Sequence, residues 1–205
     1  MALTATIVYL HGFRSSPASV KARQLAAAVA ALPDAARPVL HVPMLDAGPA
    51  MAMGAILEIA SRVDPVQLTF IGSSLGGYYA THAAERLGAR AVLINPAVRP
   101  WDDLARYRGR QVNLYTGAEF EVTDRHFDEL RALRVATITR PARYWLLVQS
   151  GDEVLDYREA IRFYAGAWQS VQGGGDHAYA GFDARIPAIL RFCGATGRPG
   201  FVHRN

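Results

Sequence analysis

Short apolar runs alternate with longer segments of helical periodicity along most of this chain. The runs are rich in valine, isoleucine, leucine and aromatic residues and occupy 6–10, 39–42, 68–71, 91–94, 144–149 and 168–171. Strands that alternate with helices form a parallel sheet, because each helix returns the chain across the sheet before the next strand starts. The pattern predicts an α/β fold, a three-layer sandwich around a mainly parallel sheet of about six strands.

Two helix starts are marked in the sequence. Ser16 and Pro17 are predicted to begin the first helix, which would place Val20 on its apolar face. Asp156, followed three residues later by Glu159, has the form of a capping box and predicts another helix start.

Residues 100–141 break the alternation. This segment is charged and aromatic, shows no strand pattern, and is too long for a plain connection. We expect it to be a small insertion that covers one end of the sheet like a lid. The chain has 205 residues, of which 51% are hydrophobic, so it can bury one sizeable core. We therefore predict a single domain over residues 1–205.

Charge and hydropathy argue against two classes of partner. No apolar run approaches the roughly 18 residues needed to span a bilayer, and no secretory signal is evident, so we expect a cytoplasmic protein without membrane contact. The net charge is +4, but Lys21 is the only lysine and the arginines are interleaved with acids. Without a basic block, nucleic-acid binding is disfavoured.

One glycine-rich turn points to nucleophilic catalysis. Gly72-Ser73-Ser74-Leu75-Gly76 fits the pattern G-x-S-x-G, lies between an apolar run and a helical segment, and is extended by Gly77. In this pattern a sharp turn presents the central serine at the tip of a parallel sheet, and the flanking glycines let strand and helix approach closely. Ser74 is therefore the candidate nucleophile.

A serine nucleophile needs a base that is oriented by an acid, and on this kind of sheet both follow the serine along the chain. Asp152 follows the apolar run 144–149 directly, and His177 ends a glycine-rich loop after the last run. Among the rival acids, Asp156 is explained as a helix cap, Glu153 is expected to point away from its neighbour, and Asp176 adjoins the histidine too closely in sequence to orient it. We predict Asp152 as the acid and His177 as the base.

Acyl transfer also needs backbone donors for the oxyanion. The amide of Leu75 follows the serine directly and is the first candidate. The second is expected after the first strand, where His11-Gly12-Phe13-Arg14 stands, so Phe13 is the candidate there. His11 is expected to fix this loop rather than to act as a base.

With these motifs in place, the chain resembles the small YqiA/YcfP-type esterase family of the alpha/beta hydrolase superfamily. The likeness covers nearly the whole chain and rests on "YLHGFRSSPAS", "IGSSLGGYYAT", "NPAVRP", "YTGAEFEVTDRH", "GDEVLDYREA" and "GGGDHAYAGF". The resemblance implies an alpha/beta hydrolase fold, with Ser74 as nucleophile, Asp152 as acid and His177 as base. It implies an esterase of acyl esters that needs neither metal nor organic cofactor, and it adds acyl thioesters such as acyl-CoA as a second candidate class.

The resemblance also draws attention to Arg99, at the carboxyl end of the fourth run. Arg99 is a candidate for binding a substrate carboxylate or phosphate, and an ion pair with Asp124 or Glu119 is the equal alternative. Tyr78 is a candidate lining residue of an acyl pocket, although most aromatic residues simply fill the core. The oligomeric state is not predictable from this sequence.

A second hypothesis is a catalytically inactive module that keeps the hydrolase fold and uses the site to bind a ligand or a protein. Fold alone does not imply activity. The two hypotheses differ in whether Ser74 reacts with an acyl donor.

Overall fold

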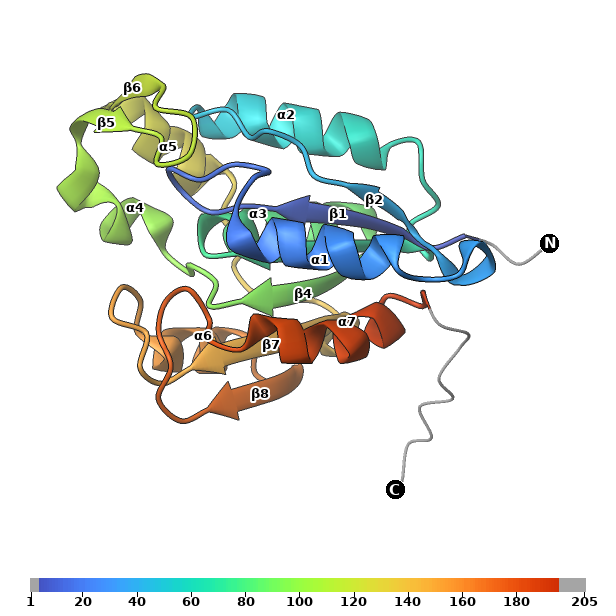
Figure 1. The fold of residues 1–205 in the computed structure, drawn as a ribbon. Coiled ribbons are helices and arrows are strands. Elements are labelled where there is room, and N and C mark those ends of the chain that lie inside the picture. Colours follow the sequence, from blue (N-terminus) through green and yellow to red (C-terminus); the bar gives the residue numbers. More distant parts are fainter. Residues whose placement is uncertain (1–3, 196–205) are drawn as a thin grey trace.

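A six-stranded parallel sheet organises the computed structural model, which describes residues 4–195 (Figure 1). Its strands lie in the order β2-β1-β3-β4-β7-β8, and every neighbouring pair is parallel. The strands are β1 (Thr6–Leu10), β2 (Val39–His41), β3 (Leu68–Ser73), β4 (Arg90–Ile94), β7 (Tyr144–Gln149) and β8 (Trp168–Gln172). The predicted α/β sandwich with about six strands is confirmed.

Helices cover both faces of the sheet. The α-helices are α1 (Val20–Ala30), α2 (Pro49–Ala60), α3 (Leu75–Leu87), α4 (Pro100–Asp103), α5 (Asp124–Ala132), α6 (Tyr157–Phe163) and α7 (Ile186–Phe192). Short 3-10 helices occupy Asp34–Ala36, Ala105–Tyr107, Pro141–Arg143 and Phe182–Arg185. Helices α1 and α7 share a face of the sheet (Figure 1), while α2, α3 and α6 pack on the other. Among residues 4–195, no helix is long and apolar enough to cross a lipid bilayer.

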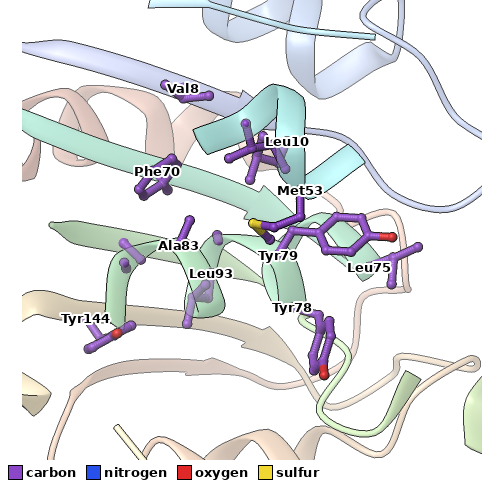
Figure 2. Close-up of a cluster of buried hydrophobic side chains, with 14 of the residues drawn as sticks. Val8, Leu10, Met53, Phe70, Leu75, Tyr78, Tyr79, Ala83, Leu93 and Tyr144 are labelled. Atoms are coloured by element: carbon purple, nitrogen blue, oxygen red, sulfur yellow. The ribbon is translucent and has the colours of Figure 1, made fainter. Parts of the chain in front are cut away.

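The core consists of two apolar layers, one on each face of the sheet. Alternate strand residues divide between them: Val8 and Phe70 face α2 and α3, whereas Tyr9 and Ile71 face α1 and α7. Figure 2 shows the first layer, where Phe70 is fully buried. Burial of one such large side chain stabilises the fold by about 1.5–3 kcal/mol, so the two layers hold the strand ends rigidly in place.

The carboxyl ends of the central strands meet at one edge. Leu10 pairs with Gly72, and Ser73 pairs with Ile94, so β1, β3 and β4 end side by side. Strand β2, which follows β1 along the chain, lies on one side of β1, and β3 lies on the other side. Because the order in which strands are added reverses at this point, a crevice opens at the carboxyl ends of β1 and β3, where ligands bind in open α/β sheets.

The insertion, residues 100–141, lies beyond this carboxyl edge (Figure 1). It carries α4, α5 and an antiparallel hairpin of β5 (Gly109–Val112) and β6 (Glu119–Val122). The prediction of no strand in this segment was therefore wrong. Each hairpin strand has only four residues and pairs only with the other, so neither carries the long apolar run of a central strand.

The first helix starts later than the sequence indicates. Helix α1 begins at Val20 with Ser19 as N-cap, whereas Ser16 forms a preceding turn in which its hydroxyl accepts from the Ala18 N–H. Val20, predicted on the apolar face, is 53% exposed. The second expected start is confirmed, because the Asp156 carboxylate accepts from the Arg158 N–H at the beginning of α6.

Candidate active site

The turn between β3 and α3 holds Ser74 in a strained conformation. Its φ of 56° and ψ of −123° lie outside the regions that a serine normally adopts. Side chains are excluded on both sides: a Cβ on Gly72 would overlap the Gly76 carbonyl, and a Cβ on Gly76 would overlap the Leu10 carbonyl. The Ser74 N–H donates to the Ile94 carbonyl at 3.0 Å, which ties the turn to β4.

Ser74, His177 and Asp152 form one hydrogen-bonded chain. The Nε2 atom of His177 lies 3.1 Å from the Ser74 Oγ, and its Nδ1 lies 2.9 and 3.0 Å from the two oxygens of Asp152. The carboxylate requires a proton on Nδ1, so neutral His177 presents an unprotonated Nε2 to the serine. This is the arrangement in which a histidine can accept the serine proton.

The environment of Asp152 favours its charged form. Its side chain is only 1% exposed, and burial alone would raise the pKa of the carboxyl. Hydrogen bonds from His177 and from the backbone N–H groups of Leu155 and Val154 outweigh burial and lower the pKa below its ordinary value. A charged Asp152 can fix the histidine tautomer and stabilise the imidazolium that forms during proton transfer.

Two buried amide side chains hold the loop that carries His177. Gln149 accepts from the N–H groups of Asp176 and Ala180 through Oε1, and its Nε2 donates to the Ala180 carbonyl. Asn95 donates from Nδ2 to the carbonyls of Asp176 and His177. Sequence reasoning missed both residues. The available signal was a polar residue at the end of an otherwise apolar buried strand, where its amide needs internal partners.

Glu153 also contacts the histidine loop. Its carboxylate accepts from the His177 N–H at 2.9 Å, and the residue lines the cleft beside Ser74. Of the two acids, only Asp152 contacts the imidazole of His177, whereas Glu153 contacts its backbone N–H.

The loop after β1, residues 11–15, runs beside the serine and contains the candidate oxyanion donor Phe13, for which it is called the oxyanion loop below. Within it, a Cβ on Gly12 would lie 3.2 Å from the Ser74 Cβ, so the backbone passes very close to the candidate nucleophile. His11 holds the loop: its Nδ1 donates to the Gly12 carbonyl, and its Nε2 accepts from the Leu45 N–H. Burial lowers the pKa of His11, which suits this neutral tautomer.

The insertion is fastened to the oxyanion loop. The Leu114 N–H donates to the Arg14 carbonyl, Arg14 Nε donates to the Val112 carbonyl, and Asn113 Nδ2 donates to the Ser15 carbonyl. Arg14 has a positive φ of 57°, so the loop is held in a conformation that an arginine rarely adopts. The hairpin of the insertion therefore fixes the segment that contains Phe13.

Two hollows lie on either side of the oxyanion loop. The first, of about 550 Å³, is the cleft that contains Ser74 and His177 and is bordered by the start of α1. The second, of about 400 Å³, is lined largely by apolar side chains, including Met44, Leu45 and Phe120. Leu75, the other candidate oxyanion donor, borders the second hollow.

The structure does not bring Arg99 or Tyr78 to either hollow. The Arg99 guanidinium lies 3.3 Å from Asp102 and 3.6 Å from Glu159, neither of which is a partner expected from the sequence. Tyr78 is 6% exposed and donates its hydroxyl to the Leu130 carbonyl at 2.6 Å, which joins α3 to α5. Their proposed contacts with substrate stay predictions.

No cluster suited to a metal ion accompanies the site. Within the described part of the chain, no three histidine, cysteine or acidic side chains gather in a way that could hold one.

Solved structures of low sequence identity share the fold of this chain. It matches a protein from Agrobacterium vitis S4, provisionally named a hydrolase, with a TM-score of 0.72 and 19% identity over 93% of this chain and 88% of the other. Est1E from Butyrivibrio proteoclasticus matches with a TM-score of 0.67 and 13% identity, over 92% and 86% of the two chains. Mouse alpha/beta hydrolase domain-containing protein 10 matches with a TM-score of 0.66 and 16% identity, over 93% of this chain and 88% of the other. The fold is that of the alpha/beta hydrolases.

The sequence profile of Uncharacterised protein family UPF0227, the YqiA/YcfP family, matches residues 6–194. The chain belongs to this family, which confirms the resemblance drawn from its motifs.

Proposed function

We propose that the protein is a serine esterase that hydrolyses acyl esters, with acyl thioesters as a second substrate class, through an acyl-enzyme on Ser74. The observation that carries this proposal is the hydrogen-bonded chain from Ser74 through His177 to Asp152, anchored on a strained strand-to-helix turn. A chain without catalytic need for these three side chains has no evident reason to strain the backbone at Ser74.

The first half-reaction forms the acyl-enzyme. His177 Nε2 removes the Ser74 proton as Oγ attacks the carbonyl carbon, and the carbonyl π electrons move to its oxygen. The N–H groups of Phe13 and Leu75 are the donors we assign to this oxyanion; a single such donor typically contributes about 10²–10³ in rate. When the tetrahedral intermediate collapses, the bond to the alcohol or thiol breaks, and the leaving group takes the proton from His177.

Hydrolysis then regenerates the serine. His177 removes a proton from water, which attacks the acyl carbon, and the second tetrahedral intermediate releases the carboxylic acid while Ser74 recovers its proton. Asp152 stays ionised throughout and stabilises each imidazolium, consistent with its lowered pKa.

A burst assay tests the proposal. We would mix wild-type protein and Ser74→Ala with a p-nitrophenyl acyl ester, follow release of p-nitrophenol, and locate the acylated peptide by mass spectrometry. A burst and an acyl group on Ser74, both lost in the variant, are expected. Neither burst nor reaction with a fluorophosphonate probe in folded wild-type protein would overturn the proposal in favour of a binding module.

A further inference from the structure

The tip of the β5–β6 hairpin, residues 113–118, presents exposed apolar side chains at the Ser74 cleft. Leu114 is 69% exposed and Tyr115 is 46% exposed, and both line the same cleft as Ser74 and His177. Neither Leu114 nor Tyr115 is part of either apolar core layer of the described chain. Packing within the fold therefore does not account for these two side chains, whereas their position at the cleft does.

The backbone beneath the two side chains is held by hydrogen bonds. Asn113 Oδ1 accepts from the N–H groups of Tyr115 and Thr116 at 2.9 and 3.0 Å. The Leu114 N–H donates to the Arg14 carbonyl of the oxyanion loop at 2.9 Å. The tip is thus pre-organised, and a ligand that packs against Leu114 and Tyr115 would have little further backbone to order.

A group bonded to Ser74 must start in this cleft. Gly12 and Phe13 line both hollows, so the oxyanion loop forms the wall between them. Of the two hollows, Ser74 borders only the cleft, whereas Leu75 borders the second hollow. The acyl group of an acyl-enzyme therefore leaves the serine on the cleft side of the oxyanion loop.

The cleft has a charged side and an apolar side. The Lys21 ammonium donates to the backbone of the histidine loop at 2.7 Å, and the Glu153 carboxylate accepts from the His177 N–H. Arg14 also lines the cleft, but its Nε donates to the Val112 carbonyl on β5. Figure 1 shows the histidine loop, between β8 and α7, and the hairpin on opposite sides of the end of β1. Charge therefore gathers at the histidine, and apolar surface at the hairpin tip.

We propose that Leu114 and Tyr115 bind the acyl chain of the substrate, and that the preferred substrates carry apolar acyl chains longer than butyrate. This inference rests on the proposed esterase function. His177 must protonate the leaving group, which places the alcohol or thiol beside the histidine loop and the acyl chain toward the hairpin tip. Binding is favourable because the chain and the two side chains remove apolar surface from water together.

The alternative is that Leu114 and Tyr115 are ordinary surface residues, since single exposed apolar side chains are common. Met51 on α2 provides the comparison. It is 70% exposed, nearly the same as Leu114, and it borders neither hollow. Met51→Gln is therefore the matched control, because it makes an equally exposed apolar side chain polar away from the cleft.

The kinetic test compares esters that differ only in acyl chain length. We would measure kcat/KM for p-nitrophenyl butyrate and p-nitrophenyl octanoate below the concentrations at which they form micelles. Full burial of one methylene contributes about fourfold, so partial burial of the longer chain should make octanoate roughly tenfold better for wild-type protein. Leu114→Asn should reduce this preference to about threefold or less, and Met51→Gln should leave it unchanged.

Tyr115→Gln repeats the test with the second side chain. An octanoate preference that survives both Leu114→Asn and Tyr115→Gln, or that is absent from wild-type protein, would overturn the proposal. Both residues are exposed, so neither substitution is expected to prevent folding.

Two further comparisons locate the acyl chain. Ethyl and hexyl butyrate vary the alcohol instead of the acyl group, and the ratio of their kcat/KM values should not respond to Leu114→Asn. A fall in that ratio would mean that the tip binds the alcohol, which overturns the assignment. Met44→Gln alters an exposed apolar side chain of the second hollow. If it lowers the octanoate preference and Leu114→Asn does not, the acyl chain lies in the second hollow and the proposal is wrong.

A binding measurement separates this proposal from the esterase function. Ser74→Ala protein is titrated by calorimetry with N-methyl octanamide and N-methyl butanamide, which carry the two acyl chains. We expect the octanamide to bind more tightly, and Leu114→Asn in the same background to remove the difference. If Ser74 forms an acyl-enzyme but neither preference depends on Leu114, the acyl site is refuted. If Ser74 is inert but the binding preference depends on Leu114, only the esterase function fails.

Discussion

Replacement of Gln149 by methionine tests how the histidine loop is positioned. Gln149 is fully buried, and methionine preserves its length and volume while removing three hydrogen bonds, of 3.0 and 2.9 Å to Oε1 and 2.8 Å from Nε2. At about 1 kcal/mol each, these bonds contribute about 3 kcal/mol to the free energy of unfolding. Burial of the apolar methionine offsets about 1 kcal/mol, so we expect a net loss of about 2 kcal/mol.

The catalytic effect of Gln149→Met should exceed its effect on stability. Without the amide, the backbone of Asp176 and Ala180 is free to shift, and His177 between them loses its alignment with Ser74. A displacement of about 1 Å costs roughly a hundredfold in rate, so kcat should fall by about that factor while KM changes little. Stability is measured by urea unfolding, and kcat with a p-nitrophenyl ester at a temperature where both proteins are folded.

Leu68→Ala provides the matched control. Leu68 is fully buried at the amino end of β3, far along the strand from the site, and its truncation costs about 2–5 kcal/mol. We expect this variant to lose at least as much stability and to keep its kcat. If Gln149→Met also keeps kcat within about twofold of wild type, Gln149 supports only the fold, and the assigned positioning role is refuted.

Two further outcomes follow from the geometry. Gly76→Ala should lower the free energy of unfolding by about 3 kcal/mol or more, because its Cβ overlaps the end of β1, whereas Gly54→Ala, with open space around it, should raise it by about 0.5 kcal/mol; equal urea midpoints would contradict this. Asn113→Ala, which removes one of the three hydrogen bonds between the insertion and the oxyanion loop, should lower kcat by roughly tenfold, and Thr116→Ala in the same turn should not; similar rates would show that the Asn113 contact does not position the loop.

The apolar runs determined the sheet. The run 144–149 coincides with β7 at both ends, and the run 6–10 coincides with β1, because a strand buried on both faces must be apolar along its whole length. Since parallel strands end at one edge, the residues that follow them converge there. Local sequence was therefore sufficient to select Ser74, Asp152 and His177 as neighbours.

Contacts between distant elements could not be inferred in this way. Arg99 meets Glu159 on α6, and Tyr78 meets the carbonyl of Leu130 in the insertion, although neither partner is marked by local periodicity. The β5–β6 hairpin was missed because its short strands are stabilised by pairing with each other rather than by the central sheet.

The sequence by itself determined which chain segments form the strands of the central sheet and which residues follow their carboxyl ends. The tertiary structure decided which buried polar groups find partners: Gln149 is satisfied by the backbone of the histidine loop, and the Tyr78 hydroxyl is satisfied by the Leu130 carbonyl of α5. The reason is physical. Periodicity records only whether a side chain is buried, but a hydrogen bond depends on distances of about 3 Å between groups that folding brings together from remote parts of the chain.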